Sequence, residues 1–161
     1  KDNEADKWQV RNFNDLAMRG IDVSANWYVP AMTGKQNGLQ RLTLGYCYLD
    51  ADVNTDVAYS RYTLNHLQHQ ITASADARWK WLSGNVRARW ADRVTTNTET
   101  KDDYFVVDAG LKANTGRFTV FAEATNLFDV TYGDIRYSET AVLTMPGRWF
   151  RAGLRYVFVG K

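Results

Sequence analysis

Alternation of apolar and polar residues along most of the chain is the feature that most restricts its fold. In the last such segment, apolar side chains take every second position from Phe150 to Phe158, and Arg151, Gly153 and Arg155 lie between them. Because successive side chains of a β-strand point to opposite faces, a period of two predicts a strand with one apolar face. The pattern recurs in the segments 21–27, 41–48, 69–81, 85–93, 103–113 and 118–125. With a weaker strand at 8–13, the sequence predicts an all-β fold of about eight antiparallel strands.

The connections between these segments alternate in length. Counting back from the C-terminus, the connection 129–146 is long, 114–117 is tight, 94–102 is of middling length, 82–85 is tight and 50–66 is long. Nearer the N-terminus, 30–38 is a longer turn and 14–19 a short loop. Tight turns at one end and longer loops at the other are typical of transmembrane β-barrels, which favours strands that cross a membrane.

The composition agrees with membrane strands and excludes other classes. Aromatic residues make up 14% of the chain, as suits a barrel with aromatic rings at both interfaces, and Trp79 and Trp81 stand just before an expected turn. No apolar run reaches the roughly 18 residues of a membrane helix. The net charge of +2, with scattered basic residues, predicts no nucleic-acid partner. We find no phosphate loop, serine elbow or Cys-x-x-Cys pair, so no enzyme and no catalytic residue is predicted.

A more specific signal lies in the last third of the chain. Asn126, Leu127, Phe128 and Asp129 follow a strand, Tyr132 comes soon after, and Pro146, Gly147 and Arg148 precede a final strand that carries Phe158. This arrangement resembles the C-terminal strands of TonB-dependent outer-membrane receptors. In that family an Asn-Leu-Phe-Asp turn closes the penultimate strand and Pro-Gly-Arg opens the last one.

The resemblance implies a wall segment of a nutrient transporter in the bacterial outer membrane. A complete receptor of this kind has about 22 strands around a plug. Residues 1–161 would then be the C-terminal portion of the barrel, without the plug. The implied partners are outer-membrane lipid, the remainder of the receptor and, through its N-terminal part, the TonB complex. The implied substrate is cobalamin, a siderophore or haem, with unknown binding residues. Leu154, Tyr156 and Phe158 would form the signal for barrel assembly.

The first residues and one acidic loop give two further expectations. The chain opens with the charged run KDNEADK and shows no signal peptide, so an exported protein would appear here as a processed or truncated product. Asp50, Asp52, Asn54 and Asp56 place oxygen ligands at every second position of an external loop. They suggest a calcium site, the one cofactor considered, although a solvated polar loop is the favoured interpretation. Thr55 and Arg61 exclude an EF-hand.

Two other barrels fit the same alternation. About eight strands would suit a complete eight-stranded outer-membrane barrel. The expected inward side chains carry about four excess positive charges, however, which is costly in a narrow lumen and favours a piece of a wide barrel. A soluble lipocalin-like barrel alternates identically but turns its apolar face inward, so the sequence pattern alone does not separate the two.

Overall fold

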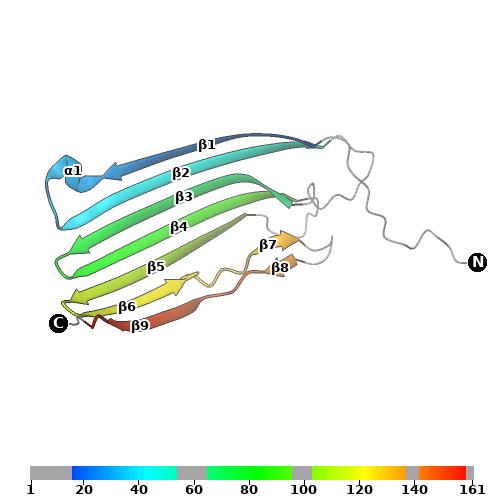
Figure 1. Ribbon diagram of the computed structural model, residues 1–161. Coiled ribbons are helices and arrows are strands. Elements are labelled where there is room, and N and C mark those ends of the chain that lie inside the picture. Colours follow the sequence, from blue (N-terminus) through cyan, green and yellow to red (C-terminus); the bar gives the residue numbers. More distant parts are fainter. Residues whose placement is uncertain (1–15, 54–64, 96–102, 137–141, 159–161) are drawn as a thin grey trace, which may run out of the picture.

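A computed structural model describes residues 16–53, 65–95, 103–136 and 142–158. They form an all-β structure whose main element is one antiparallel sheet of seven strands in the order β1-β2-β3-β4-β5-β6-β9 (Figure 1). Each strand of this sheet pairs with the strand next to it in the sequence, except that β6 pairs with β9 and not with β7. The strands are β1 (Leu16–Tyr28), β2 (Gly38–Val53), β3 (Asn65–Trp79), β4 (Leu82–Thr95), β5 (Asp103–Thr115), β6 (Phe118–Thr125) and β9 (Trp149–Tyr156). The expected all-β, antiparallel class is therefore confirmed.

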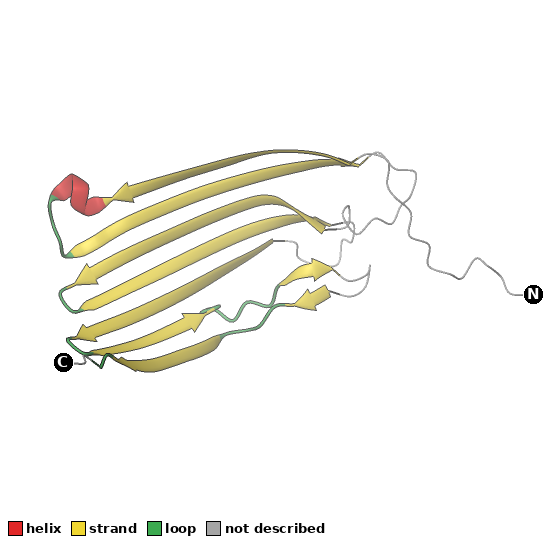
Figure 2. Cartoon of the chain, in the orientation of Figure 1, coloured by secondary structure: helices red, strands yellow, loops and turns green. Residues whose placement is uncertain are grey.

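The short connections all lie at one end of the sheet. The helical turn α1 (Val29–Thr33) joins β1 to β2, and two-residue turns join β3 to β4 and β5 to β6 (Figure 2). Among the described residues, no helix has the length and apolar character needed to cross a membrane.

A small hairpin occupies the opposite end, between β6 and β9. It consists of β7 (Gly133–Arg136) and β8 (Val142–Thr144), which pair antiparallel in a sheet of their own. The sequence pattern predicted only an irregular connection over 129–146. Strands of four and three residues are too short to produce a readable alternation.

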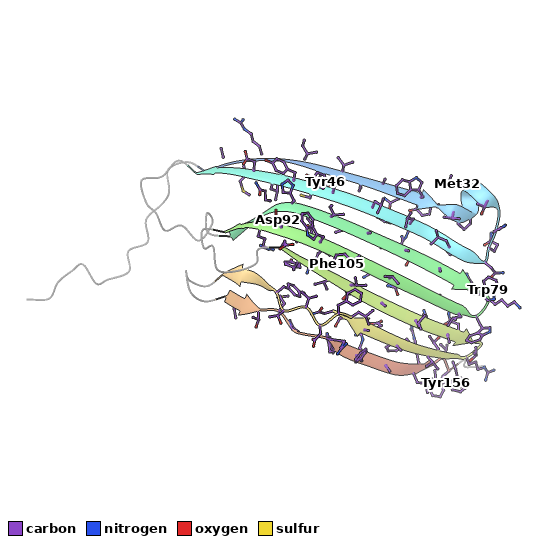
Figure 3. All side chains as sticks on the ribbon, turned by 180° about the vertical axis from the view of Figure 1, so that it is seen from behind. Met32, Tyr46, Trp79, Asp92, Phe105 and Tyr156 are labelled. Carbon is purple, nitrogen blue, oxygen red and sulfur yellow. The ribbon has the colours of Figure 1, made fainter. Side chains whose placement is uncertain are left out.

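The register sorts the side chains of the seven strands onto two faces. Cross-strand partners such as Val23, Tyr46, Ile71, Trp90 and Phe105 form one row on an apolar face. Most large side chains of this face are exposed, although Val107 is buried. The rows between them are mostly polar. Figure 3 shows Trp79 and Tyr156 near the end with the short turns and Phe105 farther along the strands.

The turn between β3 and β4 comes earlier than the sequence predicted. We expected it at 82–85, but it consists of Lys80 and Trp81, and residues 82–85 belong to β4. Lys80 takes a positive φ of 53°, which permits so tight a reversal. Gly84 lies opposite Ala77 inside the sheet, where a Cβ would come within 3.0 Å of Leu111. This glycine therefore permits a close approach between strands.

Other boundaries also differ from the expectation. Strand β1 already begins at Leu16, so residues 16–19 are strand and not an external loop. Strand β2 continues to Val53 because Asp50 and Asp52 pair with Arg19 and Ala17 of β1. The weak strand expected at 8–13 lies outside the described residues.

The two edge strands of the sheet, β1 and β9, run in the same direction. Six antiparallel pairings separate them, so the direction has reversed an even number of times (Figure 1). Within the described residues each of the two strands has a neighbour in the sheet on one side only.

The positive φ of Lys80 predicts a selective cost for β-branched side chains in this turn. Lys80→Val should destabilise the sheet by about 1–2 kcal/mol, because a left-handed backbone is strained for such a residue. Lys80→Gly should cost less. Urea unfolding of the whole chain would measure both, with Lys35→Val as the control because Lys35 is exposed and has no positive φ. Equal effects at positions 80 and 35 would contradict the assignment.

Candidate functional site

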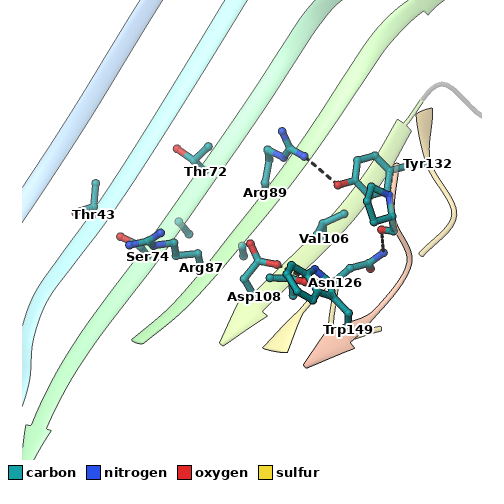
Figure 4. Close-up of a pocket in the computed structure, with 14 residues that line it drawn as sticks. Thr43, Thr72, Ser74, Arg87, Arg89, Val106, Asp108, Asn126, Tyr132 and Trp149 are labelled. Atoms are coloured by element: carbon teal, nitrogen blue, oxygen red, sulfur yellow. Dashed lines mark hydrogen bonds between the residues drawn. The ribbon is translucent and has the colours of Figure 1, made fainter. Parts of the chain in front are cut away.

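The polar face of the sheet is the hollowed one. A groove of about 460 Å³ runs across β2 to β5 as far as the segment that joins β6 to β9 (Figure 4). Hydroxyl groups line it on one side, from Thr43, Thr72 and Ser74, and Tyr132 and Trp149 line it on the other. A second hollow of about 630 Å³ continues the groove toward the short turns.

Charged side chains on the polar face are mostly cationic. Two cations are neutralised across strands: Arg41 pairs with Asp76 at 2.8 Å, and Arg151 pairs with Glu123. Within the described residues no ion pair of 4.0 Å or less involves four further cations of this face, which are Arg78, Arg87, Lys112 and Arg155. The polar face therefore keeps an excess of positive charge toward the hollow, as the sequence predicted.

Asn126 builds the turn that closes strand β6. Its side chain, only 3% exposed, donates from Nδ2 to the Val130 carbonyl at 2.8 Å, and its Oδ1 accepts the Val130 N–H at 2.9 Å. The Asn126 N–H donates to Asp108 of β5 at 2.9 Å, and the Leu127 N–H to the Val107 carbonyl at 2.8 Å. The Asn126 side chain thus provides hydrogen-bond partners for the N–H and carbonyl of Val130. The two backbone N–H groups bind the turn to β5.

Asp129 joins this turn to the start of β9. Its Oδ1 accepts the backbone N–H of Arg148 at 2.7 Å, and Arg148 Nη1 donates to the Leu127 carbonyl at 3.4 Å. Asn126 and Asp129 both have positive φ, 49° and 57°, a conformation that Asn and Asp tolerate better than other side chains. A Cβ on Gly147 would lie 2.8 Å from Asp129 Oδ1. Four residues on which the resemblance rests, Asn126, Asp129, Gly147 and Arg148, therefore join the end of β6 to the start of β9, and we call this group the closure.

Tyr132 holds the same segment over the polar face. Its ring lies 4.4 Å from that of Tyr104, centroid to centroid, and Arg89 lies over both rings, with Nη2 at 3.5 Å from the Tyr132 hydroxyl. Tyr104 belongs to the small core of the described residues, formed by Ala91, Tyr104 and Val106 with Val130 and Tyr132 packed against it. The sequence pattern missed this core, because its residues occupy positions that the alternation assigns to the polar face.

The remaining motif and terminal residues are more exposed. Leu127 is half-buried, whereas Phe128 is 61% exposed. Leu154 and Tyr156 lie on the apolar side of β9, and Phe158 follows the strand. Tyr156 contacts Phe118 at 4.8 Å and Phe158 at 4.6 Å between ring centroids, so an aromatic group forms beside the short turns.

The expected acidic loop is only partly described. Asp50 and Asp52 belong to strand β2 and not to a loop, and Asn54 and Asp56 lie outside the described residues. Among described residues, no three His, Cys, Asp or Glu side chains lie close enough together to hold a metal ion. Calcium binding by these four residues remains a prediction.

The closure predicts a coupling between Gly147 and Asp129. Gly147→Ala should destabilise the chain by about 1–3 kcal/mol, because the new Cβ meets the Asp129 carboxylate. In an Asp129→Gly background the added cost should fall close to zero, because the obstructing oxygen is gone. A double-mutant cycle from unfolding titrations would measure the coupling. Additive effects of the two substitutions would mean that the contact is absent.

The interpretation of this site depends on its own geometry. No protein-family model matches the chain, and neither does any curated protein or solved structure. The two unlike faces of the sheet and the closure between β6 and β9 are the structural features that bear on function.

Proposed function

We propose that this chain is the C-terminal wall of a TonB-dependent transporter in the bacterial outer membrane. The observation that carries the proposal is the distribution of polarity: the apolar face is exposed and the polar face is hollow. In water, an exposed apolar face of this extent would promote association. In a transmembrane barrel the same face contacts lipid and the polar face lines the lumen.

The dimensions of the apolar face support this proposal. Aromatic side chains lie near both of its ends. Trp79 lies at the end with the short turns, and Trp90 of β4 lies toward the other end, directly opposite Ile71 of β3. Trp79 lies eight residues beyond Ile71, which is about 26 Å of strand. For strands tilted by about 40°, this corresponds to a band of about 20 Å, close to the roughly 25 Å of outer-membrane barrels.

The closure between β6 and β9 favours the TonB-dependent class over other barrels. Asn126 and Asp129 form hydrogen bonds with Asp108, Val130 and Arg148. Both motif residues thus stabilise the same connection between β6 and β9. A transporter of this class takes up a scarce nutrient such as cobalamin, a siderophore or haem. We propose that Leu154, Tyr156 and Phe158 present the assembly signal, and that the rest of the receptor and outer-membrane lipid complete the barrel. The TonB complex would act through the N-terminal part.

A soluble lipocalin-like barrel has the opposite arrangement. Its apolar face surrounds the ligand and its polar face meets water. Here Asp76, Arg87 and Arg151 are among the charged side chains that line the hollowed face, which disfavours that alternative.

Single-tryptophan variants would test the membrane assignment. In lipid vesicles with brominated acyl chains, a variant that retains only Trp79 should be quenched strongly, because Trp79 is on the apolar face. A matched variant that retains only Trp149, which lines the polar groove, should be quenched weakly. Equal quenching of both, or recovery of the chain as a folded monomer without detergent, would contradict the proposal.

Leu154 provides an energetic test of the same face. It is 65% exposed on β9, and Leu154→Arg should cost about 2–4 kcal/mol of folding free energy in vesicles if it meets the lipid near the midplane. The neighbouring Arg155 lies on the polar face, so Arg155→Leu should change stability much less. Similar costs for the two substitutions would remove Leu154 from the lipid-facing set.

A further inference from the structure

We propose that the groove around Arg87 is a binding site for a small oxyanion, a carboxylate or a phosphate group carried by a solute. The proposal goes beyond the transporter assignment and does not depend on it, because it concerns the side chains of the polar face alone. A volume of about 460 Å³ lies within the range of small-molecule sites.

Arg87 has an acidic neighbour on the adjacent strand but forms no ion pair with it. Asp108 is its direct cross-strand partner, but the Asp108 carboxylate accepts the N–H of Asn126. No ion pair of 4.0 Å or less involves Arg87 among the described residues. Figure 4 shows its side chain extending toward Ser74, away from Asp108. A guanidinium presented in this way can bind an oxyanion through two parallel N–H groups.

The surroundings of Arg87 suit the remaining parts of such a ligand. Ser74 shares its cross-strand row and offers a hydroxyl donor, and Arg89 adds a second cation to the lining. The indole of Trp149 supplies a flat apolar surface at the far side of the groove. Asp108 is the one acid among the described lining residues, so the groove as a whole favours anions.

Calorimetry on the whole chain in neutral detergent, at constant ionic strength, would test the site. Citrate and inorganic phosphate serve as separate probes, and glucose serves as a neutral one. Binding of citrate alone would assign the site to carboxylates, and binding of phosphate alone to phosphate esters. Failure of both oxyanions to bind, or equal binding of glucose, would overturn the proposal.

Substitutions on the same face would locate the binding. Arg87→Gln should weaken oxyanion binding at least tenfold, and Arg87→Lys should restore part of it because it keeps the charge. Arg155→Gln is the matched control, since Arg155 is also an exposed cation of the polar face but lies outside the groove. An equal loss in both Gln variants would show a diffuse effect of surface charge and would refute a site at Arg87. An unchanged affinity in Arg87→Gln would refute it as well.

Discussion

The register of the antiparallel ladder is the constraint on which the rest of this structure depends. A slip of one residue in any strand would carry its apolar side chains to the polar face. Two bulges shift the register locally. One lies between Leu39 and Arg41 and leaves Leu39 opposite Ala77 on the apolar face while Arg41 meets Asp76 on the polar one. The other lies between Leu67 and His69 and places Leu67 opposite Arg93 on the polar face, where Leu67 packs against the small core. The hollow with its excess of cations and the exposed apolar surface both follow from this register.

The class of fold and the facing of most residues could be predicted from the sequence, because period-two alternation is a direct consequence of strand geometry. The turn at Lys80 could not, because Lys80 and Trp81 carry none of the usual turn signals, whereas the nearby Gly84 is a residue type typical of turns. Gly84 is instead required by its close contact with Leu111 of the neighbouring strand β5, a residue far from Gly84 in the sequence. A glycine can therefore resemble a turn residue in the sequence although tertiary packing is what requires it.

The closure between β6 and β9 could be located but not explained in advance. Asn126 and Asp129 were recognised as a motif, whereas their left-handed backbone and their bonds to Val130 and Arg148 required the three-dimensional arrangement. Tyr104 and Val106 show the reverse case. The alternation placed them correctly on the polar face, yet they are buried there, because the segment after Asn126 folds back over β5 and brings Tyr132 onto Tyr104. A period-two pattern does not predict that a later segment of the chain will pack over a strand.

The common direction of the two edge strands has a consequence for how the sheet can be completed. If β1 and β9 of one copy were joined directly, they would meet as parallel neighbours, in conflict with an otherwise antiparallel ladder. Any antiparallel segment that bridges them must therefore contribute an odd number of strands. Two copies could close only like to like, β1 against β1 and β9 against β9, about a two-fold axis. The parity of the sheet thus limits which partners can share its edges.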